Sequence, residues 1–283
     1  MLLTYISLAK PKILILVVMA ALSSAIVANQ GNILLIMSAP LVLAVGLASA
    51  GAAFLNNYLD RDIDAVMERT RDRPLPNGKV SPSKVFLAGL MLIAVSLPIA
   101  LLLNYLVALF ILAGALIYSV LYTMWLKRRT SLNIVIGGLA GSCGILAGWF
   151  AITTEVSLVP ILVASLVFLW TPSHFWSLAL AHQESYRKAN IPMLPVLAGV
   201  KKTADFILLS SGLLLLVSFL IYFVGSFHEV YLLGSLLLGG LFVVSNIRLW
   251  RQPKRERAWT NFKLSGIYLL GLFLSMVLDV LIY

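Results

Sequence analysis

Long uncharged apolar segments alternate along this chain with short polar segments that are rich in Lys and Arg. Each apolar segment is close to the ~20 residues that a helix needs to cross the hydrocarbon core of a bilayer. The short-period alternation of apolar and polar residues that a membrane β-barrel requires is absent. The pattern therefore predicts an all-α polytopic membrane protein with nine spans, at residues 13–29, 33–57, 85–104, 106–126, 133–152, 159–181, 206–225, 230–247 and 264–283.

Composition agrees with this pattern. Hydrophobic residues make up 61% of the chain and charged residues only 11%, whereas soluble proteins carry about 25% charged residues. The first apolar segment lacks a small-residue cleavage site, so we interpret it as a span rather than a removable signal. The single cysteine, Cys143, lies inside a span, which argues against disulfides and Cys-based metal sites. We expect residues 1–283 to form a single transmembrane domain.

The distribution of charge predicts the orientation. All 21 Lys and Arg residues fall on the membrane side of the N-terminus. The opposite loops hold only Glu155, His228 and Glu229. Because basic loops stay inside, we expect a cytoplasmic N-terminus and an outer C-terminus in the cell (plasma) membrane. The net charge of +10 then reflects topology and contact with membrane lipids, and we expect no nucleic-acid partner.

One polar segment differs from the others because it is acidic as well as basic. Five of the chain's 11 acidic residues lie between Asp60 and Asp72. Asn56, Asp60 and Asp64 are spaced four apart and share one face if the preceding span continues as a helix. Stacked carboxylates repel one another, so such a row favours a functional interpretation, and hard oxygen ligands suit Mg²⁺. Asp62 lies off this face, and we expect it to pair with Arg61 or Arg69.

These residues carry a family resemblance. The stretch "NNYLDRDIDAVMERTRDRPLPNG" resembles the first aspartate-rich motif of the UbiA superfamily, the intramembrane prenyltransferases. Within it, the heme branch of protoheme IX farnesyltransferases is the most similar. That likeness rests on "LAKPKILIL", "YTMWLKRRTSLNIVIGGLAGS", "LWTPSHFWSLAL" and "YRKANIPMLPVLAG", which extend to Gly199 in the order typical of the branch.

The resemblance implies a fold, a reaction and partners. The fold is nine transmembrane helices around a central cavity. The reaction uses Mg²⁺ and transfers a farnesyl group from farnesyl diphosphate to the vinyl group of heme b, giving heme O and diphosphate. A heme A synthase or a terminal oxidase assembly factor is an implied partner.

Site residues follow from the motif and from the shared membrane face. Asn56, Asp60 and Asp64 are the expected catalytic metal ligands. Lys10, Arg73, Lys127 and Arg128 are the expected contacts of the diphosphate. Aromatic rings such as Tyr118, Tyr122 or Trp176 could stabilise an allylic cation, and we place Trp176 and Tyr122 on the heme side. His174 is the polar residue deep within a span, roughly 12 Å further in than His182, and imidazole can ligate heme iron.

The chain also departs from the branch. Gly144 and Ile145 stand where the branch usually has a Pro pair, and Ser173 replaces the second residue of its Pro-Pro-His-Phe stretch. The second acidic motif normally has an Asp where this chain has Ser185. Glu184 is the nearest acid, and we expect it to serve as a ligand of a second metal ion.

Two other functions remain open from the sequence. Another UbiA-type prenyltransferase would use a quinone precursor or a glycerophospholipid as the acceptor. A heme-binding or transport membrane protein would share the hydropathy. Transporters often show internal repeats with interrupted helices, and no convincing repeat is present here.

Overall fold

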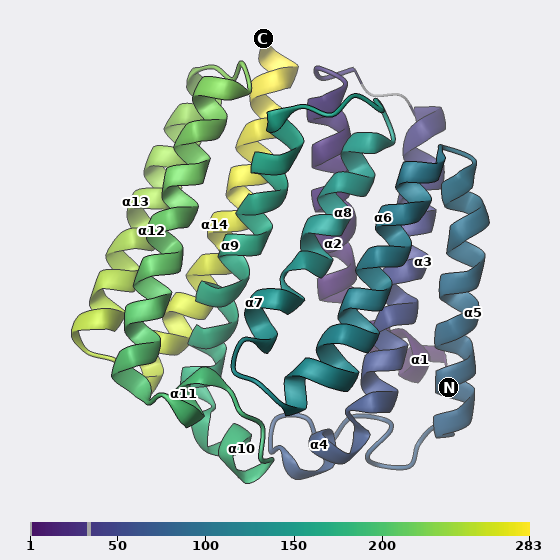
Figure 1. The fold of residues 1–283 in the computed structure, drawn as a ribbon, viewed down its shortest axis with the longest axis vertical. Helices are drawn as coiled ribbons and strands as arrows, with labels where there is room; N and C mark the ends of the chain where they lie inside the picture. The colour runs from purple at the N-terminus through teal and green to yellow at the C-terminus, as the bar shows by residue number, and fades with distance from the viewer. Residues whose placement is uncertain (1, 33–34) are drawn as a thin grey trace.

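The computed structural model describes residues 2–32 and 35–283, and all regular structure in these ranges is helical (Figure 1). The elements are α1 Leu2–Leu8, α2 Pro11–Ala28, α3 Leu35–Leu59, α4 Arg61–Val66, α5 Pro82–Leu101, α6 Tyr105–Leu116, a π-helix Ile117–Trp125, a 3₁₀ turn Leu126–Arg128, α7 Asn133–Gly137, α8 Leu139–Phe150, α9 Leu158–Ala181, α10 Gln183–Lys188, α11 Leu194–Leu197, α12 Val200–Val224, α13 Glu229–Arg251 and α14 Arg255–Ile282.

Nine helical segments within the described ranges are long and apolar enough to cross a membrane, which confirms the predicted number. Residues 33–34 of the predicted second span lie outside the described residues, and α3 forms the rest. The short helices α1, α4, α10 and α11 lie together at one end of the bundle, and the C-terminus lies at the other (Figure 1). The basic connections therefore share one end of the molecule with the N-terminal helix.

Several span boundaries were predicted wrongly. The seventh span was expected at 206–225, but α12 begins at Val200; the ninth was expected at 264–283, but α14 begins at Arg255. The eighth, α13, extends to Arg251 rather than to 247. Each error has the same cause, because charged residues were read as loop. Long basic side chains can occupy the ends of a helix while their charged groups reach the interface.

The fourth and fifth spans each change helical geometry part-way along, a feature on which the sequence analysis made no prediction. After α6 the chain widens into a π-helix, in which the Thr123 hydroxyl donates to the Tyr118 carbonyl at 2.7 Å. The fifth span divides at Gly138 into α7 and α8. A Cβ at Gly137 would lie 2.7 Å from Cδ2 of Tyr122, so the absent side chain permits close approach of the π-helix. π-helical turns occur frequently at functional sites.

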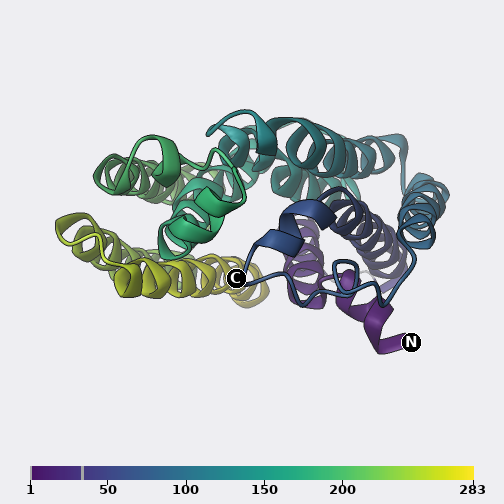
Figure 2. The same cartoon turned by 90° about the horizontal axis from the view of Figure 1, so that it is seen from below.

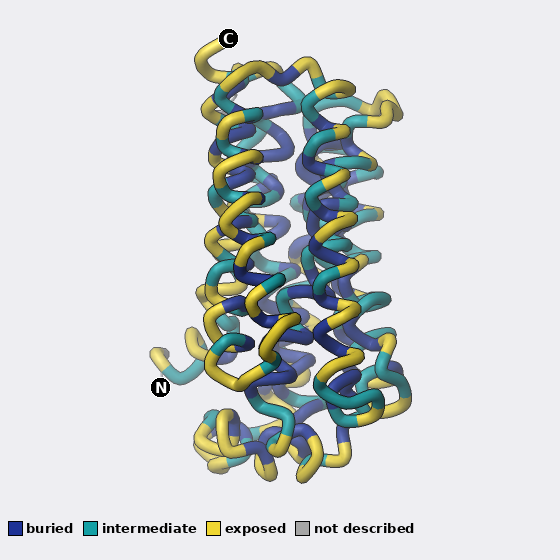
Figure 3. The backbone as a smooth tube through the Cα atoms, turned by 90° about the vertical axis from the view of Figure 1, so that its left-hand side faces the viewer, coloured by how far each residue is buried: buried dark blue, intermediate teal, exposed yellow. Residues whose placement is uncertain are grey.

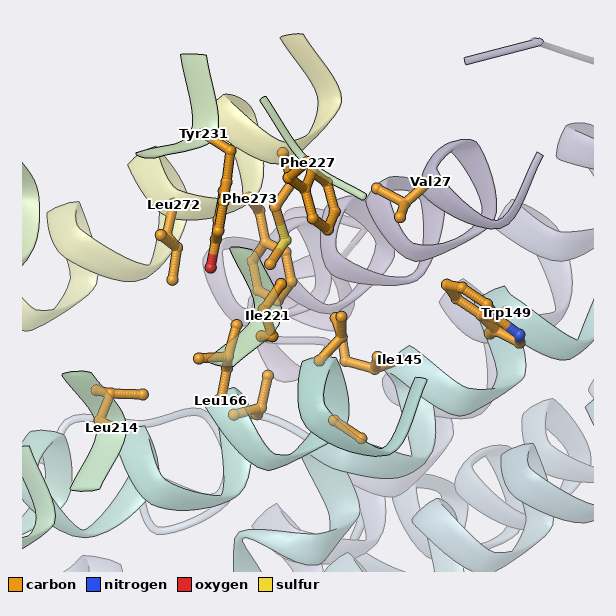
Figure 4. Packing of buried hydrophobic residues seen from close by; sticks show 14 of the residues in the cluster. Val27, Ile145, Trp149, Leu166, Leu214, Ile221, Phe227, Tyr231, Leu272 and Phe273 are labelled. Carbon is orange, nitrogen blue, oxygen red and sulfur yellow. The ribbon is translucent and has the colours of Figure 1, made fainter. Parts of the chain in front are cut away.

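Packing joins the helices into two groups. One contains α2, α3, α5, α6 and α8, and the other contains α9, α12, α13 and α14; contacts of α8 with α9 and of α2 with α14 connect them. Figure 2 shows this arrangement from the end that carries the short helices. A buried cluster that includes Ile145, Leu166, Ile221 and Phe273 lies where the groups meet (Figure 4). Exposed positions follow the outer surfaces of the helices (Figure 3), where many are apolar, as expected for contact with lipid.

Candidate active site

A row of three polar side chains crosses the junction of α3 and α4. The Asp60 amide donates to the Asn56 carbonyl at 2.9 Å, and the Asp64 amide donates to the Asp60 carbonyl at 2.7 Å. These i to i−4 bonds keep the helical register through the junction, so Asn56, Asp60 and Asp64 share one face as the spacing predicted. All three residues are buried, at 1–3% exposure. Buried carboxylates must be paired or bind a cation, because burial without a partner is costly.

Cations from three other segments surround this row. Lys127 Nζ lies 2.6 Å from Asp60 Oδ2, and Arg73 Nη1 lies 2.7 Å from Asp64 Oδ2. Lys10 Nζ donates to Asn56 Oδ1 and lies 3.3 Å from the Tyr118 hydroxyl. The structure thus brings together six of the residues that the sequence placed in the metal and diphosphate site.

The local backbone conformation places each of the three cations beside the row. Lys10 joins α1 to α2 in the left-handed region, with φ 52°. Lys127 follows the π-helix in the 3₁₀ turn. Arg73 lies in a series of turns, where its amide donates to the Thr70 carbonyl at 3.0 Å. None of these conformations has a periodic sequence signal, so they could not be predicted as elements.

The electrostatics of the site favour an anion. Burial, together with the nearby charge of Arg73, lowers the pKa of Lys10 to about 7, although the Asp60 carboxylate acts in the opposite direction. Among the described residues in these contacts, two carboxylates face the three cations Lys10, Arg73 and Lys127. The surplus of positive charge would increase when a metal ion binds, which suits a multiply charged phosphate ligand.

Thr123 fixes the orientation of Asn56, a role that the sequence analysis missed. The Thr123 hydroxyl is fully buried and gives its hydrogen to the Tyr118 carbonyl. Its oxygen must therefore accept from Asn56 Nδ2, at 2.9 Å. The same nitrogen donates to Asp60 Oδ2 at 2.8 Å. Both amide hydrogens are used, so Asn56 Oδ1 points toward Lys10 and is the amide atom that can ligate a metal ion.

We predict that Thr123→Val weakens metal binding, because it leaves an Asn56 hydrogen without an acceptor and lets the amide rotate. The apparent dissociation constant for Mn²⁺, measured by electron paramagnetic resonance of the purified protein, should rise about tenfold. Thr123→Ser keeps the acceptor and should bind Mn²⁺ within about twofold of the parent. Equal Mn²⁺ affinity of the Val and Ser variants would remove Thr123 from this role.

One observation tests directly whether the row fits a metal ion. Asp60 Oδ1 is buried and has no hydrogen-bond partner in the structure. The buried carboxylate of Asp279 differs, because its oxygens accept from the backbone amides of His228 at 2.8 Å and Tyr231 at 2.9 Å. Asp279 therefore stabilises the start of α13, whereas Asp60 keeps an unused oxygen ligand. Together with Asn56 Oδ1 and Asp64, this donor set fits Mg²⁺, which commonly completes its coordination with water and substrate phosphate.

The donor set is small. In the part of the chain that the structure describes, no group of three or more His, Cys, Asp or Glu side chains could hold a metal ion. The row supplies two carboxylates and one amide, so water and substrate oxygens would complete the coordination of Mg²⁺.

The sequence profile of the UbiA prenyltransferase family matches residues 16–276. The chain belongs to the UbiA prenyltransferase family. A protein named protoheme IX farnesyltransferase from Desulforudis audaxviator is 45% identical over 240 residues, which cover 84% of this chain and 76% of that protein. One of the same name from Symbiobacterium thermophilum is 41% identical, covering 98% of this chain and 93% of that protein. These relatives confirm the resemblance to the heme branch.

Solved structures confirm the UbiA fold. A digeranylgeranylglyceryl phosphate synthase superposes with a TM-score of 0.83 at 21% identity, covering 100% of this chain and 99% of that one. A UbiA homolog from Archaeoglobus fulgidus, bound to GPP and Mg²⁺, superposes with a TM-score of 0.69 at 17% identity, covering 96% and 99% of the two chains. At these identities, the solved structures show that this UbiA-family chain shares their fold.

The structure leaves one predicted phosphate contact outside the row. Both terminal nitrogens of Arg128 lie 2.7 Å from the Asp62 carboxylate, and one also donates to the Leu59 carbonyl at 2.8 Å. The expected pairing of Asp62 with Arg61 or Arg69 was wrong, because the 3₁₀ turn places Arg128 beside α4. The hydrogen bond from Arg128 lowers the pKa of Asp62 to about 2. Arg128 thus contacts α4 from the end of the fourth span.

Glu184 is also separate from the row in this UbiA-family chain. It lies on α10, with 70% of its side chain exposed, and it pairs with Arg187. No contact among the described residues joins it to Asp60 or Asp64. Its predicted role as a second metal ligand stays a prediction, and metal binding there requires the pair with Arg187 to open.

We predict that Glu184→Gln raises the Mg²⁺ concentration needed for half-maximal transfer about tenfold, as loss of one carboxylate ligand would. Ser185→Asp, which restores the residue usual in the branch, should keep the Mg²⁺ requirement of the parent. The measurement is a Mg²⁺ titration of transfer by each purified variant. An unchanged requirement in Glu184→Gln would exclude Glu184 from the metal site.

Of the acceptor-side candidates, His174 and Trp176 lie on α9 and Tyr122 lies on the π-helix. His174 Nδ1 lies 2.6 Å from the Ser265 hydroxyl of α14, and the imidazole stacks on Trp170 at 4.1 Å between ring centroids. Trp176 is buried in a cluster with Ile63. Tyr122 stacks on Tyr118 at 5.9 Å between ring centroids, and the Tyr118 hydroxyl lies 3.3 Å from Lys10 Nζ. The structure thus joins Tyr122 to the metal side and His174 to the α9–α14 contact.

A second group that sequence reasoning missed packs at the end of the bundle that carries the short helices. Ile63 and Met67, beside the row, pack in one cluster with Tyr186 and Ile191 from the segment around α10. The two polar connections therefore cover the end of the bundle as one unit. Their apolar residues alternate with charges, and this irregular pattern gave no signal for packing.

Proposed function

We propose that this chain transfers the farnesyl group of farnesyl diphosphate to the vinyl group of heme b, forming heme O and diphosphate. The observation that carries the proposal is the buried row of Asn56, Asp60 and Asp64 among three cations, with Asp60 Oδ1 unpaired. This arrangement occurs in a UbiA-family chain whose relatives at 41% and 45% identity are named protoheme IX farnesyltransferase.

The site's residues act on the leaving group. Lys10, Arg73 and Lys127 bind diphosphate oxygens and stabilise the charge that develops when the bond from farnesyl C1 to oxygen breaks. Arg73 can make two parallel contacts, whereas the lysines act as point charges. Asn56, Asp60 and Asp64 would hold Mg²⁺, which supplies further neutralisation of the departing diphosphate. Burial of the row keeps these charges effective, because they act away from bulk water.

The acceptor step forms the new carbon–carbon bond. The electron pair of the heme vinyl group attacks farnesyl C1, and the cation left beside the macrocycle takes the oxygen of a water molecule, which loses a proton. The product carries a hydroxyethylfarnesyl side chain. Tyr118 and Tyr122 present ring faces near the row and stabilise the allylic cation. His174 contacts the acceptor, and Trp176, two residues further along α9, borders it at the end near the row, where it packs with Ile63.

The proposed setting is the cell membrane. We place the N-terminus, the metal row and the diphosphate on the cytoplasmic side and the C-terminus outside, because the basic connections gather at the N-terminal end. Residues 1–283 act as one transmembrane prenyltransferase domain. A heme A synthase or an oxidase assembly factor is the proposed partner, because the apolar farnesyl chain of heme O favours direct transfer within the membrane.

An acceptor competition tests this function. The purified protein is incubated with farnesyl diphosphate, Mg²⁺ and equal amounts of heme b, an aromatic quinone precursor and a glycerol phosphate lipid. The proposal predicts farnesylated heme as the main product. A prenylated quinone precursor or lipid as the main product would support the alternative acceptors, and heme binding without any transfer would support a carrier.

A further inference from the structure

A polar cavity lies on the side of the metal site that faces α1. It has a volume of about 450 Å³ and lies between α1 and the turns that follow α4. Figure 2 shows α1 beside these turns at the end of the bundle. The lining residues are Leu3, Thr4, Ser7, Lys10, Asn57, Asp72, Arg73, Pro74 and Lys79. This volume falls within the ~300–1,000 Å³ of typical small-ligand pockets.

The cavity connects the buried site with the surface. Lys10 and Arg73 line it, and the same two side chains contact Asn56 and Asp64 of the metal row. At the other end, Ser7 and Lys79 are exposed. The row itself is almost fully buried. Lysine and arginine side chains therefore continue from the site to the surface along this cavity.

The charge of the diphosphate product requires a polar route out of the site. The reaction that we propose above leaves a small, highly charged diphosphate beside Lys10 and Arg73, and an ion of this kind cannot leave through the hydrocarbon core. Four of the lining residues, Lys10, Asp72, Arg73 and Lys79, are charged, which suits an ion better than the farnesyl chain. Asp72 also lines the cavity, and its negative charge opposes long retention of an anion there.

We propose that this cavity is the passage through which inorganic diphosphate leaves the site, with Lys79 as its contact nearest the surface. The proposal rests on the proposed function for the origin of the diphosphate. Narrowing a passage slows the association and the dissociation of diphosphate by the same factor, so the dissociation constant does not change. Changing a residue of the binding site alters the ratio of the two rates and therefore the dissociation constant.

The test is the kinetics of inorganic diphosphate binding to the full-length protein with Mg²⁺. Ser7→Trp narrows the cavity with an exposed residue that contacts no member of the metal row. We expect association and dissociation each to slow about tenfold, while the dissociation constant stays within about twofold of the parent. The matched control is Ser83→Trp, an exposed serine at the start of α5 outside the cavity, which should change neither rate.

A charge variant provides a second, independent measurement. Lys79→Glu should slow diphosphate association about tenfold at low salt, and less at high salt. Lys84→Glu, an exposed lysine outside the cavity, is its control. Unchanged rates in both Ser7→Trp and Lys79→Glu, or effects confined to the dissociation constant, would overturn the passage. Failure of the parent to transfer farnesyl to heme b would instead contradict the proposed function, and the diphosphate rates would still decide the passage.

Discussion

Asp60→Ala and Asp64→Ala are each expected to lower farnesyl transfer on the order of 10³-fold, because each removes a metal ligand and leaves a cation without its partner. Lys127 would lose its contact with Asp60, and Arg73 its contact with Asp64. The measurement is the steady-state rate of transfer at limiting Mg²⁺, with membrane insertion of each variant checked by detergent extraction and size-exclusion chromatography.

Asp62→Ala is the matched control for both variants. It removes an aspartate from the same segment, but one that pairs with Arg128 on the exposed side of α4. An exposed ion pair contributes little to stability, so transfer should stay within about twofold of the parent. Near-normal turnover by Asp60→Ala or Asp64→Ala at limiting Mg²⁺ would contradict the assignment of the row.

The second prediction with a large effect distinguishes the binding site of the farnesyl donor from that of the heme acceptor. Lys127→Ala should weaken farnesyl diphosphate binding by about 10–100-fold, the effect of losing one charge-assisted contact, and leave heme b binding unchanged. His174→Ala should do the reverse, because His174 lies roughly 12 Å deeper along α9 than His182 and contacts α14 rather than the row. Separate titrations of the two ligands give both dissociation constants for each variant.

His228→Ala is the control for the histidine variant, since His228 lies at the opposite end of the molecule beside Tyr283. It should bind both ligands as the parent does. Weaker diphosphate binding with unchanged heme binding in His174→Ala would mean that the two substrates do not occupy separate ends of the cavity.

The metal row was predictable because it follows a regular period. Asn56, Asp60 and Asp64 repeat every four residues, and a helix brings such residues to one face whatever surrounds them. The clustering of basic residues predicted that Lys10 and Lys127 lie on the same side of the membrane. Their contacts with Asn56 and Asp60 were not predictable, because these depend on a left-handed residue and on a π-helix that have no periodic signal.

The contacts of Thr123 and Arg128 could not be predicted from the sequence. Thr123 reads as an ordinary residue of an apolar span, and its role appears only when the π-helix places it against Asn56. Arg128 reads as equivalent to Lys127, yet adjacent residues in a 3₁₀ turn point in different directions. One contacts the buried row and the other an exposed carboxylate. The predicted ends of several spans were wrong for a related reason. Charged residues indicate where the membrane interface lies, and the helix can continue beyond it.

The most direct measurement of the central claim is mass spectrometry of the hemes extracted from cells that produce this protein and otherwise make only heme b. The account predicts a new heme whose mass exceeds that of heme b by one farnesyl group and one hydroxyl group. It also predicts that this heme is absent from cells producing Asp60→Ala at equal membrane abundance. Only heme b in cells with the parent protein, or the same farnesylated heme with Asp60→Ala, would contradict the account.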